Sequence, residues 1–405
     1  MDIADFDGAE YARRVEKIRG ALADAGLEAM LIVDEPNYRY VTGHHTEAWK
    51  VPFARRVCWV LRDRDPVILV PPGEGRDASE YSPWSDVREH DGFVWGPLEI
   101  AGAKLVEYED SLVELLVESG EELGLSGAGS LGMPMRGWTI PDLQFGVVRA
   151  AGERLGIEWV DVTALLWKAR LIKSDAEIAQ MRAAVGALDA AFAGTFESVR
   201  VGTTEKEISR MTKANILLGG AEEVAFTFAD ADVSDDRAIG AAPRETRVKD
   251  GAIVLLDAGA VVHGYRSDYN RLAIVGEPSS AQAEAYGQLF EAHTAGLEAV
   301  RPGATAGDVA MAIRESLAAS GVEVAPLGPN PPEELGHGIG VELPEPPFLV
   351  PGSSFELEQG MILTIEPNAF FPGVGRLVLE DDIVVTAGGA EQLSTKPTPA
   401  QLIRL

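Results

Sequence analysis

Four carboxylates and one histidine stand in or beside short apolar segments in the second half of the chain. They are Asp257 in LLDAG, Asp268 in YRSDYN, His337 in GHGIG, Glu366 in TIEP and Glu380 in VLEDD. A carboxylate beside an apolar strand is costly to bury unless something compensates its charge. A fold that buries all five must bring these distant segments together around a shared cationic partner, and this requirement constrains the fold more than any other feature of the sequence.

Each of the five residues has an ordinary explanation when it is taken alone. Asp257 could be a turn residue at a strand end, and Asp268 could face it across a hairpin through His263 and Gly264. His337 lies between glycines, which let a backbone approach a ligand but also occur in ordinary loops. The basic residues close by in sequence are Arg266, Arg271 and Arg376. These are too few to neutralise the set, whereas divalent ions accept mixed carboxylate and imidazole ligands.

Composition and charge argue against several other classes of protein. The net charge of −29, without a basic run, disfavours a nucleic-acid partner. The longest apolar stretch, GAIVLLDAGAVV, is too short for a membrane span, and the acidic N-terminus does not resemble a secretory signal. A single cysteine, Cys58, cannot form an intrachain disulfide, so we expect a cytoplasmic protein. The acidic, lysine-poor balance fits a salt-rich habitat and a GC-rich genome equally well.

The first part of the chain has the pattern of an α/β domain. Apolar residues at helical spacing predict a helix over 11–25, and a second helix is expected over 111–123. Strands are predicted in LEAMLIVD, RRVCWVLRDRD, PVILVPPGE and GSLGM, with a turn at RDRD between the second and the third.

The character of the chain changes near residue 170. Ser174 with Glu177, and Thr204 with Glu207, have the spacing of helix capping boxes, and a further helix is predicted over 309–320. We expect His263 at a hairpin tip and His293 on a helix surface. Strands are predicted in GAIVLLDAG, YNRLAIVG, MILTIEP and RLVLEDDIVVT. The prediction is an α+β chain with domains at 1–168 and 169–405, the second combining helices with a largely antiparallel sheet.

The sequence resembles the creatinase and aminopeptidase family of pita-bread metallohydrolases, which includes prolidase and the Xaa-Pro aminopeptidases. DAGAVVHGYRSD, GHGIGVELPEPP, ELEQGMILTIEPNAFFPGVG and VLEDDIVVTAGGAEQLS match its signature blocks in order and spacing. NYRYVTGHHTEAW resembles its non-catalytic, creatinase-like N-terminal domain, and RLIKSDAEIAQMRAA its interdomain junction. The resemblance covers nearly the whole length and implies that the second domain is a pita-bread catalytic domain.

The resemblance also implies a ligand set for two divalent ions. Asp257 would chelate one ion, Asp268 and Glu380 would bridge both, and His337 with Glu366 would complete the second. Manganese is the expected metal, although zinc, cobalt and iron tolerate the same ligands. Such a pair activates a bridging hydroxide for attack on a peptide bond. Glu366 is the candidate to carry the proton of that water to the leaving nitrogen, and His337 is the other candidate catalytic residue.

Several positions depart from the pattern of the family's peptidases. Gly240 and Pro344 replace two histidines that bind the peptide carbonyl in the family. Val378 replaces an arginine, with Arg376 displaced by two, and Asn270 replaces a threonine. The sequence therefore predicts a prolidase-type dipeptidase or aminopeptidase with a rebuilt substrate pocket. The alternative is a hydrolase or lyase of a small non-peptide metabolite, as in the creatine, ectoine and sulfonium-propionate enzymes of the family. A non-catalytic binding module is disfavoured because all five ligands are retained.

The segment GHHTEAW in the first domain is the other candidate for substrate contact. In the family, the equivalent loop can reach the active site of a neighbouring subunit, which makes His44, His45 and Trp49 candidate substrate-binding residues and implies a homodimer. The alternative is a solvated loop with Trp49 packed beneath it. The expected partner is a dipeptide or another small molecule, without nucleic acid or membrane.

Overall fold

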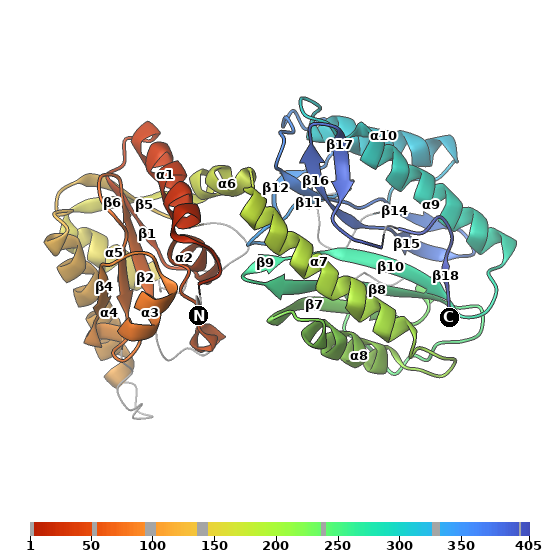
Figure 1. Ribbon diagram of the computed structural model, residues 1–405, viewed down its shortest axis with the longest axis horizontal. Coiled ribbons are helices and arrows are strands. Elements are labelled where there is room, and N and C mark those ends of the chain that lie inside the picture. The colour runs from red at the N-terminus through yellow and green to blue at the C-terminus, as the bar shows by residue number, and fades with distance from the viewer. Residues whose placement is uncertain are drawn as a thin grey trace. The chain divides into compact units, whose positions relative to one another are not determined.

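The computed structural model describes residues 4–50, 55–93, 103–135, 145–235, 240–325, 333–396 and 398–405. The chain separates into two compact units, Met1–Arg170 and Leu171–Leu405 (Figure 1). Each unit has its own sheets and its own apolar core, so each is described by itself. No helix within the described ranges is long and apolar enough to cross a bilayer.

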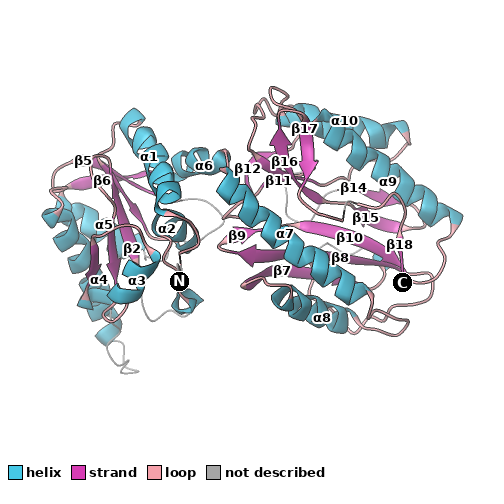
Figure 2. Cartoon of the chain, in the orientation of Figure 1, coloured by secondary structure: helices cyan, strands magenta, loops and turns pink. Residues whose placement is uncertain are grey.

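The first unit is built on a six-stranded sheet of order β4-β3-β2-β1-β5-β6. Its strands are β1 (Ala29–Ile32), β2 (Val57–Leu61), β3 (Val67–Val70), β4 (Val87–Glu89), β5 (Gly129–Met133) and β6 (Ile157–Asp161). Its helices are α1 (Gly8–Asp24), α2 (Glu35–Thr42), α3 (Gly75–Tyr81), α4 (Ala103–Glu122), α5 (Phe145–Leu155) and α6 (Thr163–Leu171). Strands β2 and β3 pair antiparallel, as the RDRD turn predicts, whereas β5 pairs parallel with both β1 and β6. The α/β prediction for this part is confirmed (Figure 2).

The core of the first unit forms where the sheet meets α4 and α5. Trp59 of β2 is fully buried there, and its indole N–H donates to Ser119 Oγ at 3.0 Å. Cys58, the next residue towards the N-terminus, is also fully buried.

The second unit carries four long helices, α7 (Asp175–Phe196), α8 (Glu205–Leu218), α9 (Ser280–Ala299) and α10 (Ala306–Ala319). One sheet has the order β18-β10-β8-β7 and includes β9 as an extra partner of β8. Its strands are β7 (Glu223–Asp230), β8 (Ile253–Val262), β9 (Tyr265–Arg266), β10 (Tyr269–Ile274) and β18 (Ile403–Arg404). Helices α7 and α8 pack along it in Figure 1.

A second sheet of the same unit has the order β12-β11-β13-β16-β17, and a separate hairpin pairs β14 with β15. These strands are β11 (His337–Gly338), β12 (Glu345–Phe348), β13 (Ile362–Ile365), β14 (Asn368–Phe371), β15 (Gly375–Val378), β16 (Asp381–Thr386) and β17 (Gly389–Gln392). Helix α9 packs against β13, β14, β15 and β17, and α10 packs against α9. All the strand pairings named within this second sheet and the hairpin are antiparallel, which confirms the predicted mixture of helices with largely antiparallel strands.

Two predicted helix starts in this unit are confirmed, whereas the predicted position of one histidine is wrong. Ser174 with Glu177, and Thr204 with Glu207, form the predicted capping boxes of α7 and α8. His263 has a φ of 48° at the β8–β9 turn, as expected for a hairpin tip. His293 does not lie on a helix surface: it is 1% exposed in α9, and its Nε2 is 3.2 Å from Asp381 Oδ2. The reason is that the buried face of α9 includes His293 together with Leu289.

Candidate metal centre

The register of β8 and β10 places Asp257, in the middle of β8, beside the start of β10, which Asp268 precedes. Asp257 is paired with Asn270, and Asp268 immediately precedes β10. Because side chains alternate between the two faces of a sheet, Asp257 and Asn270 share a face, whereas Tyr269 lies on the other. Tyr269 donates its hydroxyl to Asp189 of α7 at 2.8 Å. The carboxylate of Asp257 therefore lies on the face of the sheet away from α7.

The second sheet supplies the other three residues. His337 begins β11, Glu366 directly follows β13, and Glu380 directly precedes β16. An isolated bridge between Asn270 and Glu380 joins the two sheets at this point. Strands that are distant in sequence thus bring the predicted residues into one region of the second unit.

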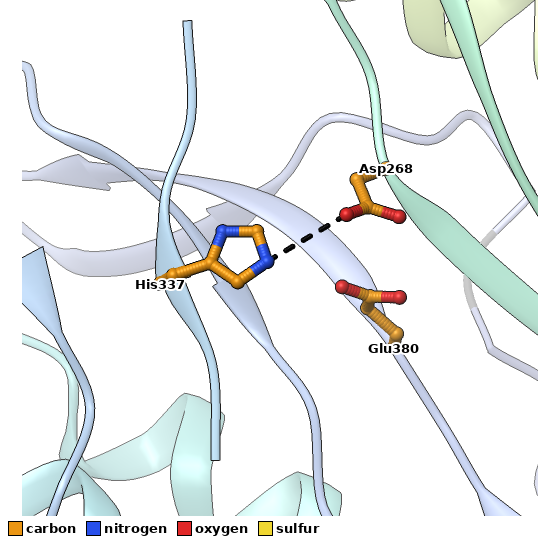
Figure 3. A group of neighbouring side chains, drawn as sticks. All are labelled: Asp268, His337 and Glu380. Atoms are coloured by element: carbon orange, nitrogen blue, oxygen red, sulfur yellow. Dashed lines mark ion pairs between the residues drawn. The ribbon is translucent and has the colours of Figure 1, made fainter. Parts of the chain in front are cut away.

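Three of the five residues form a compact group in Figure 3. One ligand atom from each of Asp268, His337 and Glu380 lies within 4.8 Å of the others, and all three residues are buried. His337 Nε2 is 3.6 Å from Asp268 Oδ2. Its Nδ1 lies 3.0 Å from the carbonyl oxygen of Gly338, so an Nδ1–H tautomer donates there and leaves the Nε2 lone pair facing the carboxylates. Burial lowers the pKa of His337 to about 4, which keeps the imidazole neutral at physiological pH.

Asp257 and Glu366 lie close enough to this group to change its electrostatics. Burial, followed by the charges of Asp257, Glu366 and Asp382, raises the pKa of Asp268 well above its ordinary value. Burial also raises the pKa of Asp257 to about 7, and raises that of Glu380 far above normal with contributions from the neighbouring carboxylates. The charges of neighbouring carboxylates thus make ionisation of Asp268, Glu366 and Glu380 less favourable.

The protein itself does little to compensate these charges. Asp257 Oδ1 and Glu380 Oε1 are buried and accept no hydrogen bond from the residues that the structure describes. Arg271 is a buried cation beside Glu380, but its guanidinium donates to Asp381 and to the backbone carbonyls of Asn270, Glu380 and Lys396. Unsatisfied carboxylate oxygens and one free imidazole nitrogen form the donor set that Mn²⁺, Zn²⁺, Co²⁺ and Fe²⁺ accept. The group can therefore hold a metal ion.

The structure adds residues that the sequence did not single out. Asp382 Oδ2 accepts the backbone N–H of Asp268 at 2.9 Å and so helps to fix that loop. Glu334 is 4% exposed, burial raises its pKa to about 7, and its charge acts on Glu366. The run Glu380-Asp381-Asp382 could have drawn attention to Asp382. No local pattern marks Glu334, which simply lies three residues before His337.

The three candidate substrate-binding residues all lie in the first unit. His44 is 1% exposed and its Nδ1 lies 2.9 Å from the Tyr38 hydroxyl; burial lowers the pKa of His44 to about 4. Trp49 is 8% exposed, and its ring packs against that of Tyr38 at 5.4 Å between centroids. His45 is less buried and contacts the Tyr81 ring at 4.8 Å. The structure thus shows Trp49 packed beneath the loop, and the role of these residues in substrate binding stays a prediction.

The positions that depart from the peptidase pattern lie in the second unit. Gly240 has a φ of +90°, a conformation that side-chain-bearing residues rarely adopt. Pro344 lies between β11 and β12, and Val378 is buried opposite Asn368. Asn270 is buried with its Nδ2 3.4 Å from Glu380 Oε2.

Comparison with known proteins agrees with this fold. The model of metallopeptidase family M24 matches residues 179–387, and that of the creatinase/prolidase N-terminal domain matches residues 14–172. The chain is 31% identical to a probable dipeptidase PepE of Mycobacterium tuberculosis over 400 residues, covering 97% of this chain and 96% of that protein. It is 29% identical to an Xaa-Pro dipeptidase of Pyrococcus horikoshii over 271 residues, covering 67% of this chain and 74% of the relative.

A solved structure extends the similarity to the whole fold. An Xaa-Pro dipeptidase from Bacillus anthracis superposes with a TM-score of 0.79 at 27% identity, covering 98% of this chain and 100% of the other. The resemblance inferred from the signature blocks is confirmed, and so is the architecture of a creatinase-like domain followed by an M24 domain. The chain is a hydrolase that belongs to metallopeptidase family M24.

Proposed function

We propose that the protein is a prolidase-type hydrolase that depends on two divalent ions and cleaves a dipeptide or an N-terminal peptide bond. Asp257, Asp268, His337, Glu366 and Glu380 would hold the ions, and manganese is the expected metal. One observation carries the proposal: buried carboxylates converge with His337 Nε2, while Asp257 Oδ1 and Glu380 Oε1 receive no hydrogen bond from the described part of the chain. The relatives described as dipeptidases support the peptide substrate.

A bound pair of divalent ions would supply Lewis acidity, which makes water a nucleophile near neutral pH and polarises a carbonyl group. The protein would contribute proton transfer through Glu366. Glu366 is buried, and the charges of Asp257 and Glu334 act on it, so its carboxyl lies within the same group as the other acidic side chains. Glu366 would accept the proton of the attacking water and deliver it to the leaving nitrogen as the C–N bond breaks. Neutral His337 would bind an ion through Nε2, and the hydrogen bond that its Nδ1–H donates to the Gly338 carbonyl oxygen would orient the ring.

A second function is favoured by one specific feature, the absence of histidine at Gly240 and Pro344. Neither residue has a side chain that donates a hydrogen bond, so neither can stabilise a developing oxyanion as an imidazole does. The same metal-binding group would then serve a hydrolase or lyase of a small non-peptide metabolite.

The test compares substrates and metals with purified protein. Metal-free protein should be inactive, and added Mn²⁺ should restore hydrolysis of Xaa-Pro or other dipeptides. Glu366→Gln should lower kcat by about 100-fold or more because it removes the proton carrier. Glu358→Gln, which alters an exposed carboxylate close to β13, is the matched control and should leave kcat unchanged. If no metal supports dipeptide turnover while a small amide is hydrolysed, the alternative function replaces the first.

The homodimer and the cytoplasmic location remain predictions from the sequence. Light scattering of the active protein measures the first. A monomer with full activity would remove any role of His44, His45 and Trp49 at a neighbouring subunit's site.

A further inference from the structure

A pocket of about 630 Å³ lies in the second unit, on the face of the β8–β10 sheet along which α7 packs (Figure 1). Tyr269 and Arg271 of β10 line it. Because side chains alternate along a strand, both project away from the face that carries Asp257. Helix α7 lines the pocket with four residues whose spacing places them on one side of the helix: Asp189, Phe192, Ala193 and Phe196. The pocket is therefore separate from the candidate metal centre.

The interior of the pocket is mainly apolar. The Phe192 ring packs against that of Tyr269 at 5.0 Å between centroids, and it lies 6.2 Å from the ring of Phe196. The C-terminal segment completes the lining with three half-buried apolar residues: Pro399, Ile403 and Leu405. A surface of aromatic rings and aliphatic side chains binds an apolar group by removing it from water.

The buried polar residues that line the pocket already have partners within the protein. Both carboxylate oxygens of Asp189 accept hydrogen bonds, and the donors belong to Tyr269, Ser394 and Thr395. The guanidinium of Arg271 donates to Asp381 and to backbone carbonyl oxygens. An apolar ligand can therefore enter without depriving these groups of their hydrogen bonds.

The exposed charged residues of the pocket are mostly basic, although the whole chain has a net charge of −29. They are Arg200, Lys396 and Arg404, against a single acidic residue, Glu197. Arg404 is paired with Glu277 at 2.6 Å. Arg200 donates to the carbonyl oxygen of the preceding residue, and within the described ranges neither Arg200 nor Lys396 forms an ion pair with a carboxylate. These two side chains leave positive charge at the pocket for an anionic group.

We propose that this pocket is a second ligand site, which binds a medium-chain carboxylate or a similar amphipathic anion. The apolar chain would lie against Phe192 and Phe196, and the anionic group would pair with Arg200 or Lys396. The volume is typical of sites for small organic ligands. This inference does not depend on the proposed function, because the pocket shares no residue with the predicted metal ligands.

Calorimetric titration of the Mn²⁺-loaded protein with decanoate tests the proposal, with hexanoate and decyltrimethylammonium as comparison ligands. Decanoate should bind at least about tenfold more tightly than hexanoate, because its longer chain removes more methylene groups from water. It should also bind at least about tenfold more tightly than decyltrimethylammonium, although the negative charge of the whole protein favours the cation. Titration of the metal-free protein should give the same dissociation constant for decanoate.

Two double variants separate the charge of the pocket from the charge of the whole protein. Arg200→Glu combined with Lys396→Glu should weaken decanoate binding at least about tenfold, because both cations of the pocket become anions. Arg210→Glu combined with Lys213→Glu is the matched control, since both residues are exposed on α8 and lie outside the pocket. It makes the same change in net charge and should alter decanoate binding by less than about twofold. Ala193→Trp, which places an indole in the pocket, should abolish binding.

Several results would overturn the proposal. Decanoate binding that requires Mn²⁺ would place the carboxylate on the metal ion instead of in the pocket. Absent binding, tighter binding of the cation, or equal weakening in both double variants would also reject the site. If decanoate does not bind, and sedimentation shows a dimer that dissociates only in the Arg200 and Lys396 variant, the pocket is a contact between two copies of the chain.

Discussion

Arg271 is a buried cation beside the candidate metal centre that supports the site without neutralising it. Its Nη2 donates to Asp381 Oδ1 at 2.7 Å, and its Nη1 donates to the carbonyl oxygens of Asn270 and Glu380. The guanidinium also lies over the Tyr269 ring, 4.4 Å from its centroid. Arg271 therefore fixes the backbone that carries Glu380, while its charge is directed to Asp381.

Arg271→Met should destabilise the protein by about 3–5 kcal/mol, because it leaves Asp381 buried without its main counterion. Urea unfolding measures the loss, and Arg271→Lys should lose less because it keeps the charge. Arg404→Met removes an exposed ion pair with Glu277 and should change stability by less than about 1 kcal/mol. If Arg271→Met were no worse than Arg404→Met, Arg271 would not be the support that its contacts indicate.

The pH dependence of this pair follows from the pKa of Asp381. Burial alone would raise that pKa, but the charge of Arg271, with a smaller contribution from His293 Nε2 at 3.2 Å, outweighs burial, and the pKa lies below its ordinary value. A carboxyl with a lowered folded-state pKa stabilises the protein above its unfolded pKa of about 4, and this contribution is lost as pH falls further. The difference in stability between wild type and Arg271→Met should therefore shrink below about pH 4.

At the scale of elements, the long helices of the second unit share one device at their starts. Helices α7, α8, α9 and α10 each begin with a side chain that accepts the N3 backbone N–H while the N3 side chain accepts the N-cap N–H. In α9 the two residues are Ser279 and Gln282. Such a box satisfies two backbone donors that the helix itself leaves unpaired.

Two adjacent serines at the start of α9 allow a matched test of this device. Ser279→Ala removes the cap and should cost about 1 kcal/mol in the free energy of unfolding. Ser280→Ala changes a neighbour that is also exposed but already inside the helix, and it should cost less than about 0.5 kcal/mol. Chemical denaturation of both variants measures the difference, and equal losses would contradict a specific capping role.

The same elements show which parts of the fold the sequence could predict. Polar caps followed by apolar periodicity mark α7 and α8 correctly. Helix α9 has the same cap spacing at Ser279 and Gln282, but its apolar periodicity is weaker because small residues such as Ala285, Ala292 and Gly296 make up part of its buried face. Helix α10 begins at Ala306 rather than at 309. Its first turn contains Gly307, where a Cβ would lie 2.5 Å from the Ser353 carbonyl oxygen. Close packing therefore requires glycine at this position, although glycine has a low helix propensity.

The candidate site was predictable where charge and local pattern coincide. Asp257, Glu366 and Glu380 stand beside apolar strands, and only a shared partner explains their burial. Glu334 could not be found in this way, because a glutamate in a loop is an ordinary residue. Its relation to the site depends on the approach of Glu334 to Glu366, which is a long-range feature.

At the scale of the whole molecule, the candidate metal centre opposes folding when no cation is bound. Burial raises the pKa of Asp257, Asp268, Glu366 and Glu380, so ionising them within the fold costs free energy. A group with a raised folded-state pKa stabilises the protein below its unfolded pKa and loses this contribution as pH rises through the folded value. Metal binding reverses the relation, because it needs the deprotonated carboxylates and displaces their protons.

The stabilisation given by Mn²⁺ should therefore depend strongly on pH. At pH 5 the carboxyls hold protons that compete with the ion. At pH 8 Asp257, whose pKa is about 7, has lost its proton and no longer needs to release one when the ion binds. His337 stays neutral at both values because burial lowers its pKa to about 4, so it does not contribute to the competition. Saturating Mn²⁺ should raise the Tm by several degrees more at pH 8 than at pH 5.

Differential scanning calorimetry with and without Mn²⁺ at the two pH values measures this difference, and titration in two buffers of different ionisation enthalpy counts the protons released. Glu380→Gln should abolish most of the shift at pH 8, because it removes a carboxylate oxygen from the compact group formed with Asp268 and His337. Glu358→Gln, exposed and outside that group, should keep the shift. A shift of equal size at pH 5 and pH 8, without proton release, would mean that the ion binds elsewhere and that these carboxyls are not its ligands.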